Sequence, residues 1–228
     1  MVKIKNRLNS LVKYIDYEDK VMDVGCDHAL LDIFLVQEGI LDKVYVCDVN
    51  PNALENGKRN IEANNMVGKV IPILGFGIEK SVNLDIDTLI ISGMGSNSII
   101  EIISSPFLNK IYKLVLQSNN NHYDLRKYLT KIGFNIYVEE IIKDGKKEYI
   151  NIIALRDNII KTYSEKEYLF GPVLIKDKNN LDYFIKLKEE YEELYYRNRN
   201  EKHEIGLKYL EEIVSDLKKS WNKVENNI

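Results

Sequence analysis

Residues 21–31, which read Val-Met-Asp-Val-Gly-Cys-Asp-His-Ala-Leu-Leu, constrain the fold of this chain more than any other stretch. The apolar start predicts a short strand, Gly25 predicts a tight turn, and the apolar spacing over 29–36 predicts a helix. A strand that enters a helix through such a turn directs backbone N–H groups and the positive end of the helix towards one point. The stretch therefore predicts a ligand site within an α/β fold.

Two acidic residues flank the predicted turn, and a third ends the next predicted strand. Asp23 lies within the strand and Asp27 follows Gly25, so the site disfavours a pyrophosphate and favours a ligand with positive charge or hydroxyl groups. Residues 44–48 predict a strand that ends at Asp48, about 20 residues after the turn, where doubly wound sheets bind ribose hydroxyls. The dinucleotide fingerprint is absent, because Cys-Asp-His follows Gly25. These features favour S-adenosylmethionine, a nucleoside with a cationic sulfonium, over NAD.

Three longer motifs carry a resemblance to a known family. They are Met22-Asp-Val-Gly-Cys-Asp-His-Ala-Leu-Leu-Asp32, Ile91-Ser-Gly-Met-Gly95, and Leu114-Val-Leu-Gln-Ser-Asn119 followed by Leu125, Arg126 and Leu129. Further matches at Arg7, Leu8 and Phe170-Gly-Pro172 extend the similarity, in order, along nearly the whole chain. In these motifs the chain resembles the bacterial tRNA (adenine-22-N1)-methyltransferases. The combination of Asp-x-Gly-x-Asp-His-Ala with Gly-Met-Gly is specific.

The resemblance implies an α/β fold of the class I methyltransferase (Rossmann-like) type with a seven-stranded sheet. Apolar runs predict strands at 21–24, 44–48, 69–74, 84–92, 111–117, 136–142 and 149–155. Helical spacing predicts helices over 3–17, 29–36, 50–64 and 96–105, and one more that residues 119–122 cap and Gly133 ends. Asp144 and Gly145 form a hairpin signal between the last two strands. Five strands separated by helices and followed by a hairpin is the class I methyltransferase order.

Beyond Pro172 the composition changes and the spacing becomes that of a coiled coil. From Leu181 the recurring apolar residues are Phe184, Leu187, Tyr191 and Leu194, and later Leu207, Leu210, Val214, Leu217 and Trp221. The polar residues 197–203 separate these two segments, so an antiparallel helical hairpin is expected. We therefore expect residues 1–160 to form a SAM-binding domain with an N-terminal covering helix. Residues 161–228 would form a tRNA-binding appendage.

Composition limits the classes of partner. The formal net charge is −3, so a local basic patch must bind tRNA. Cys26 and Cys47 predict buried free thiols, and His122 and His203 have no partners in the sequence, so no metal site is expected. No apolar run approaches the ~20 residues of a membrane span, and no signal peptide pattern is present. A cytoplasmic monomer that does not bind membranes is expected.

The residue pattern and the resemblance together imply three sets of functional residues. The cofactor-binding set is Asp23, Gly25, Asp27, His28, Asp48, Val49, Asn50, Gly75, Phe76 and Gly77. The catalytic set, which would face the transferred methyl group and hold the flipped adenine, is Gly93, Met94, Gly95, Gln117 and Asn119. The RNA-binding set is Arg7, Arg126, Arg197, Arg199 and Lys202.

Each assignment has a structural alternative. Asp23 and Asp27 could cap the turn, and His28 could begin the helix or pack against it. The Gly-Met-Gly segment could be a simple strand-to-helix turn. Arg126 could be a surface residue, and the basic face of residues 3–13 could be only a solvated face.

Several positions depart from what the resemblance implies. Phe76 stands where similar proteins carry an acid that meets the cofactor's adenine, and Asp48 stands where the family usually has Glu. Asp32 and Ser118 stand where prolines are usual, and a Tyr-Ile pair at Tyr149 replaces the usual Tyr-Glu. These differences describe a divergent member that is still expected to bind the cofactor.

The implied chemistry needs few catalytic groups. Adenine N1 carries a lone pair, so alignment for in-line displacement suffices, and the base must be unpaired or flipped to be reached. Two competing functions remain open: a methyltransferase for a small molecule or protein, and a non-catalytic tRNA-binding module.

Overall fold

The computed structural model describes residues 2–225, with side chains for residues 2–221. The chain divides into two compact units, Met1–Ile160 and Lys161–Ile228. Among the described residues, no helix combines the length and the apolar character needed to cross a membrane.

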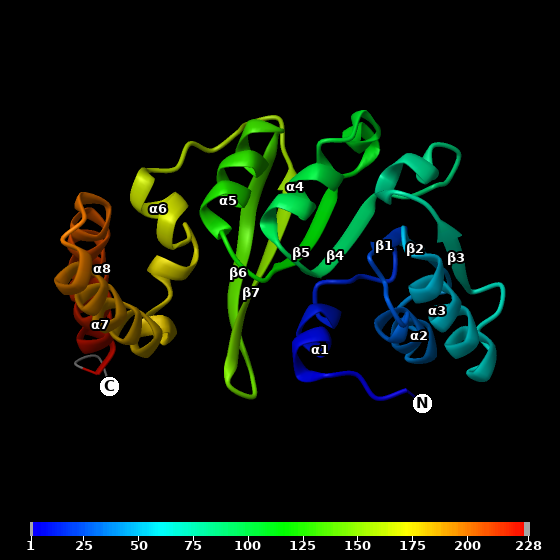
Figure 1. Cartoon of the computed structure of the whole chain (residues 1–228), viewed down its shortest axis with the longest axis horizontal. Coiled ribbons are helices and arrows are strands. Elements are labelled where there is room, and N and C mark those ends of the chain that lie inside the picture. Colours follow the sequence, from blue (N-terminus) through cyan, green and yellow to red (C-terminus); the bar gives the residue numbers. More distant parts are fainter. Residues whose placement is uncertain (1, 226–228) are drawn as a thin grey trace. The chain divides into compact units, whose positions relative to one another are not determined.

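The first unit is built on one seven-stranded sheet of order β3-β2-β1-β4-β5-β7-β6 (Figure 1). The strands are β1 Val21–Val24, β2 Val44–Asp48, β3 Val70–Leu74, β4 Thr88–Met94, β5 Lys113–Ser118, β6 Phe134–Asp144 and β7 Lys147–Arg156. Strands β1 to β5 pair in parallel, whereas β7 runs antiparallel to both β5 and β6. This arrangement confirms the predicted class I methyltransferase fold. Because β2 and β3 lie on one side of β1 and β4 on the other, the strand order reverses between β1 and β4, where open α/β sheets bind ligands.

Helices connect these strands as expected, with shifted boundaries. They are α1 Asn6–Val12, α2 Leu30–Gln37, α3 Pro51–Ala63, α4 Ser96–Ile103 and α5 His122–Lys131. The helix predicted over 3–17 is shorter than expected, although Ile15 beyond its end is still buried. The strand predicted from residue 84 begins only at Thr88, because the Leu84 N–H donates to Ser81 O and closes a turn there.

The centre of the sheet is apolar on both faces. All four residues of β1 are buried, and Leu89, Ile90 and Ile91 of β4 are fully buried. Strands covered on both sides read as continuous apolar runs, which explains why these segments showed no alternation. Burying one such side chain contributes about 1.5–3 kcal/mol, so the β1–β4 pair is a rigid platform for the loops at its carboxyl end.

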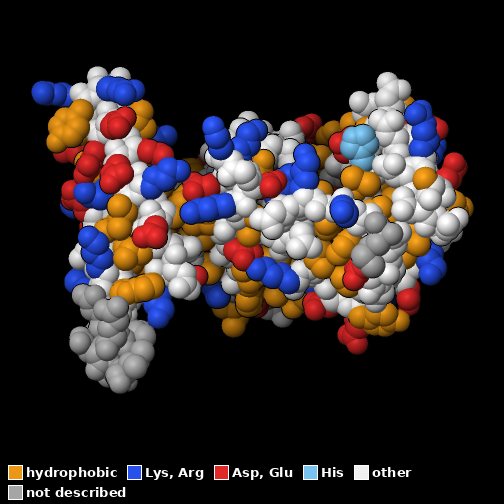
Figure 2. Space-filling view, turned by 90° about the horizontal axis from the view of Figure 1, so that it is seen from below, with side chains coloured by type: hydrophobic (Ala, Val, Ile, Leu, Met, Phe, Trp, Pro, Cys, Tyr) orange, Lys and Arg blue, Asp and Glu red, His pale blue; other side chains and the backbone are white. Residues whose placement is uncertain are grey.

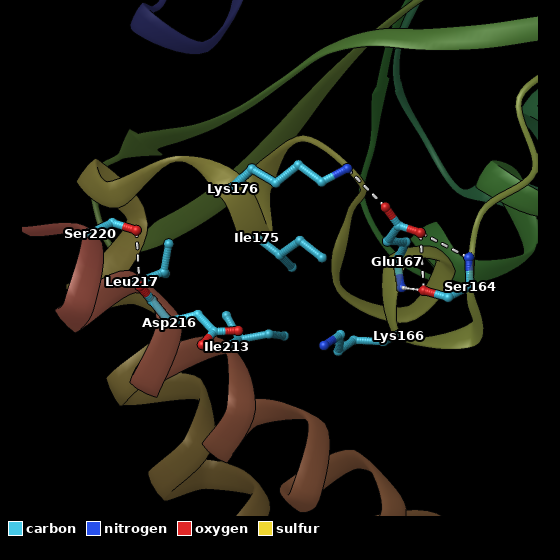
Figure 3. A pocket seen from close by; sticks show the side chains of 9 residues that line it. All are labelled: Ser164, Lys166, Glu167, Ile175, Lys176, Ile213, Asp216, Leu217 and Ser220. Atoms are coloured by element: carbon cyan, nitrogen blue, oxygen red, sulfur yellow. Dashed lines mark hydrogen bonds and ion pairs between the residues drawn. The ribbon is translucent and has the colours of Figure 1, made fainter.

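The second unit contains the helical hairpin together with a short segment that packs on it. Its helices are α6 Glu165–Phe170, α7 Leu181–Asn198 and α8 Glu201–Glu225 (Figure 1). Ser164 begins α6 through a capping box: the Glu167 N–H donates to Ser164 Oγ, and the Ser164 N–H donates to Glu167 Oε2 at 2.9 Å (Figure 3). The turn from α7 to α8 uses Arg199 with a left-handed φ of 38°.

The core of the second unit differs from a free-standing coiled coil. Its buried apolar residues are Phe170, Leu174, Phe184, Leu210, Ile213, Val214 and Leu217. Phe170 and Leu174 precede the hairpin, and Phe170 packs edge-on against Tyr191 with ring centroids 5.8 Å apart. Two predicted seam residues are exposed, Leu194 by 38% and Trp221 by 42%. The hairpin therefore buries its seam mainly where residues 165–176 cover it.

Candidate active site

The turn after β1 has an unusual backbone. Gly25 has a φ of 79°, and its N–H donates to Cys47 O of β2 at 2.8 Å. Asp27 (φ 48°) and Ala29 (φ 53°) also adopt left-handed conformations, although neither is glycine. Such residues cost of order 1–3 kcal/mol each and concentrate at ligand sites. Ala29 offers no polar side chain to cap α2, so the first N–H groups of that helix have no capping hydrogen bond from a side chain at this position.

Asp48 joins this turn to the next one. Its Oδ1 accepts a hydrogen bond from the Asn50 N–H at 2.8 Å, and its Oδ2 accepts one from the Asp27 N–H at 3.4 Å. Asn50 in turn caps α3 by accepting from the Asn52 N–H at 2.9 Å. The carboxylate is thereby fixed at the carboxyl end of β2, beside the point where the strand order reverses.

Two adjoining cavities lie at this edge of the sheet. The first, of about 440 Å³, is lined by residues that include Gly25, Asp48, Phe76 and Met94. The second, of about 360 Å³, shares Gly25, Asp27 and Met94 with the first and extends towards α1. Each of the predicted cofactor-binding residues lines at least one of the two cavities: Asp23, Gly25, Asp27, His28, Asp48, Val49, Asn50, Gly75, Phe76 and Gly77.

Met94 lies at the boundary between the cavities. A Cβ atom added to Gly25 would lie 1.9 Å from Met94 Cε, so only glycine permits this contact. The pairing of β4 with β5 shifts register between Ser92 and Met94, and Gly93 has a φ of 79°. Asn119 holds this irregular segment, because its N–H donates to Met94 O at 2.9 Å and its Nδ2 donates to Gly93 O at 2.7 Å.

The prediction that Gln117 holds a substrate base is wrong. Its side chain is fully buried and bonds entirely within the protein. Nε2 donates to Asn151 Oδ1 at 2.6 Å and to Arg7 O at 3.0 Å, while Oε1 accepts from Arg7 Nη1 at 2.9 Å. Gln117 therefore orients Arg7 rather than a ligand. Gly95 and Asn119 also lie outside the residues that line the two cavities.

Arg7 was expected to contact RNA from an outer basic face, but the structure places it at the second cavity. Its guanidinium lies against Gly93, over the ring of Tyr149 at 5.7 Å, and lines the second cavity. The long-range bonds to Gln117 could not be read from local spacing, because they join residues 110 positions apart.

The prediction that Arg126 contacts phosphate is also wrong. Its side chain is 1% exposed, and Nε forms an ion pair with Glu139 Oε1 at 2.7 Å. The other residues of the RNA-binding set, Arg197, Arg199 and Lys202, are exposed in the second unit. His203, at the same turn, is half-buried and packs edge-on against Tyr191.

Sequence patterns missed part of the cavity lining. Ser98 and Glu101 of α4 and Ile102 line the first cavity, and Lys3 and Lys5 line the second. The first three share one helical face just after Gly-Met-Gly, so the helical period could have indicated them. The lysines lie in the segment before α1, whose path depends on tertiary contacts.

Burial controls the charges at this edge of the sheet. Burial raises the pKa of Asp23 to about 7; a hydrogen bond from Asp32 and the Arg7 charge oppose this rise, and the Asp48 charge adds to it. Burial also raises the pKa of Cys47 to about 11 and that of Cys26 still further. Both thiols are therefore protonated and unreactive near neutrality, as expected for buried free cysteines.

The geometry suits a nucleoside cofactor with a charged amino-acid end. Asp48 at the end of β2 can accept ribose hydroxyls, and Phe76 and Ile102 offer apolar surface to a flat base. Beyond Gly25, Asp23 faces the second cavity and can accept an ammonium group. A mixed sheet with this strand order, in which only β7 runs antiparallel to its neighbours, together with this site defines a class I methyltransferase that uses S-adenosylmethionine.

Comparison with known proteins identifies the family. The family model for tRNA (adenine(22)-N(1))-methyltransferases, TrmK, matches residues 21–219. The tRNA (adenine(22)-N(1))-methyltransferase of Bacillus subtilis is 25% identical over 184 residues, which cover 78% of this chain and 77% of that protein. The M. capricolum TrmK structure with S-adenosyl-homocysteine is 26% identical, covers 95% of this chain and 97% of that one, and has a TM-score of 0.78.

A second similar structure contains the cofactor itself. Sp1610 of Streptococcus pneumoniae in complex with S-adenosyl-L-methionine is 25% identical, covers 93% of this chain and 100% of that one, and has a TM-score of 0.84. The chain belongs to the tRNA (adenine(22)-N(1))-methyltransferase family. It is thus an S-adenosylmethionine-dependent enzyme that methylates N1 of adenine 22 in tRNA.

The two contrasting arginines give a test of burial. Arg126→Ala should lower the free energy of unfolding by about 3–5 kcal/mol, because Glu139 is left as a buried charge without its partner. Arg197→Ala breaks an exposed pair with Glu193 and should change stability little. Urea unfolding of both variants measures the difference. Equal stability of the two variants would contradict the structural role of Arg126.

Proposed function

We propose that the two cavities divide the work of methylating N1 of adenine 22 in tRNA. The observation that carries this assignment is the fixed carboxylate of Asp48, which lines the same cavity as Gly25 and Met94. The first cavity would hold the adenosine part of the cofactor, with ribose hydroxyls on Asp48 and the adenine against Phe76. The second cavity would hold the methionine part beside Asp23 and admit the substrate adenine near Gly93.

The residues of this site act mainly by orienting the reactants. The cofactor supplies an electrophilic methyl group on a cationic sulfur. Gly93 and Met94, held by Asn119, would place a backbone edge beside the substrate base. Arg7, held by Gln117 and lying over Tyr149, would contact the base or its phosphate at the mouth of the second cavity. N1 attacks with its own lone pair, so no general base is required.

We also propose that the turn of the helical hairpin contacts the tRNA backbone. Arg197, Arg199 and Lys202 gather there, and Figure 2 shows Lys and Arg side chains at the end of the hairpin drawn at upper left. Of the described carboxylates, none forms an ion pair with Arg199 or Lys202. These side chains are therefore available to phosphates, whose contacts dominate nucleic-acid affinity.

A pocket elsewhere in the second unit suits this role less well. It has a volume of about 420 Å³, and Lys166 and Lys176 lie at it (Figure 3). Lys166 pairs with Glu212 at 3.0 Å, and Lys176 pairs with Glu167 at 2.9 Å. Because both lysines are already paired with carboxylates, the pocket offers little net positive charge.

The two units would have separate roles: the first would bind the cofactor, and the second would bind tRNA. We expect the protein to act in the cytoplasm as a monomer.

Asp48 gives a direct test of the cofactor site. Asp48→Ala should weaken S-adenosylhomocysteine binding by about 1–3 kcal/mol, because the ribose hydroxyls lose their charged acceptor. Calorimetry measures the dissociation constant. Asp85→Ala is the control, since it removes an exposed acid paired with Lys20 far from both cavities. An unchanged dissociation constant for the Asp48 variant would reject the ribose role.

The target base is tested with transcribed tRNA and radiolabelled S-adenosylmethionine. Label should enter a tRNA with adenine at position 22 and should be lost when guanine replaces it, because guanine N1 carries a proton in place of the lone pair. Label that persists in the guanine transcript would reject adenine 22 as the target.

The hairpin turn is tested by changing its three basic residues together. Arg197→Ala with Arg199→Ala and Lys202→Ala should raise KM for tRNA and lower the slope of log KM against log salt by about 2–3, because three phosphate contacts are lost. Binding of S-adenosylhomocysteine should not change. Lys208→Ala with Lys218→Ala and Lys219→Ala is the matched control, with the same charge change on exposed positions of α8. Equal salt slopes for the two variants would reject the contact.

A further inference from the structure

Helix α2 buries a carboxyl group in an otherwise apolar face. Asp32 is fully buried, and its neighbours on the helix, Leu31 and Ile33, are buried with it. Apart from its own backbone N–H, no described residue offers either carboxyl oxygen an N–H or O–H donor. An ionised carboxylate without a donor is very costly in such a place. Asp32 must therefore be satisfied in another way.

The Asp32 side chain lies within hydrogen-bond reach of the Asp23 side chain of β1. Asp23 is 4% exposed, and it lines the second cavity. Two carboxylates have no donor between them, so a hydrogen bond can join them only if one carries a proton. Two buried like charges side by side also disfavour double ionisation. The pair therefore keeps at least one proton near neutrality.

The surroundings decide which acid keeps that proton. Burial and the Asp23 charge raise the pKa of Asp32 well above its ordinary value, whereas the pKa of Asp23 rises only to about 7. Several charged and titratable groups face the pair or share its cavity. They are Lys3 and Lys5 before α1, Arg7 on α1, Cys26, Asp27 and His28 in the turn after β1, and Cys47 and Asp48 of β2. Arg7 favours the ionised form of Asp23. Among the described residues, no positive charge opposes the rise in the pKa of Asp32.

We propose that Asp32 is a positioning residue whose protonated carboxyl donates a hydrogen bond to Asp23 and holds that carboxylate towards the ammonium group of the cofactor's methionine part. This inference rests on the proposed cofactor site. This pair of acids makes the amino-acid end of the cofactor, and not its nucleoside end, sensitive to pH.

The sign of the pH effect follows from the ionisation of Asp23. An ammonium group binds ionised Asp23, so cofactor affinity should rise as pH rises towards and through 7. With an Asp23 pKa of about 7, affinity should increase about eightfold between pH 6.0 and 7.5, since protonation competes with binding. Methylthioadenosine lacks the amino acid and should show little change over the same range.

The test combines two substitutions with two ligands. Asp32→Asn keeps a neutral hydrogen-bond donor and should bind S-adenosylhomocysteine within about twofold of the wild type. Asp32→Leu keeps a similar branched shape and has no donor, so it should bind about tenfold more weakly at pH 7, with the midpoint of the pH profile shifted upwards. Calorimetry with both ligands across pH 6.0–7.5 measures these changes. Methylthioadenosine should bind all three proteins equally.

Each contrary result overturns a defined part of this inference. Unchanged affinity and pH midpoint in Asp32→Leu, or an equal loss in Asp32→Asn, would reject hydrogen-bond donation by Asp32. Equal weakening of methylthioadenosine would show general damage to the pocket and also reject it. The wild-type comparison needs no variant, and parallel pH profiles for the two ligands would contradict the role of the pair. Failure of the wild type to bind S-adenosylhomocysteine would instead overturn the proposed cofactor site itself.

Discussion

The contact between Met94 and Gly25 is the constraint on which the rest of the site depends. Strands β1 and β4 pair in parallel, and beyond their paired residues the Met94 side chain lies against Gly25 at the point where the strand order reverses. The absence of a Cβ at Gly25 leaves room for the Met94 methyl group, and Asn119, which follows β5, holds the irregular segment at Gly93 and Met94. Gly25 and Met94 line both cavities, so the two cavities meet at this contact.

Acids at the strand ends give the site its chemical selectivity. Asp48 is held by backbone N–H groups from two loops, which makes it a fixed acceptor. Asp23 is buried and paired with a second acid, so its charge depends on its surroundings. In the proposed site, a cofactor with ribose hydroxyls at one end and an ammonium group at the other would meet a different kind of carboxylate at each. The absence of a glycine-rich pyrophosphate loop agrees with this distribution of charge.

The comparison of Asp48 with Gln117 shows what residue patterns could and could not predict. Asp48 ends an apolar strand at a set distance from a glycine turn, and its position follows from the geometry of one βαβ unit. Gln117 also ends a strand, but its amide bonds to Arg7 and Asn151, which come from the two ends of the first unit. The predicted phosphate contact of Arg126 was wrong for a related reason: Arg126 forms a buried ion pair with Glu139 of β6, which local spacing does not reveal. Polar residues resemble surface or ligand-binding residues until their tertiary partners are known.

The sequence by itself determined the class of fold, the β1 turn, the acid at the end of β2 and the helical hairpin, because each depends on periodicity or spacing within a short segment. Only the tertiary structure decided that Gln117 and Arg126 are internal, that Arg7 reaches the second cavity, and that Asp32 lies against Asp23. Those facts depend on contacts between residues far apart in the chain and on burial. Burial changes the free energy of a charged or polar group far more than its neighbours in sequence do.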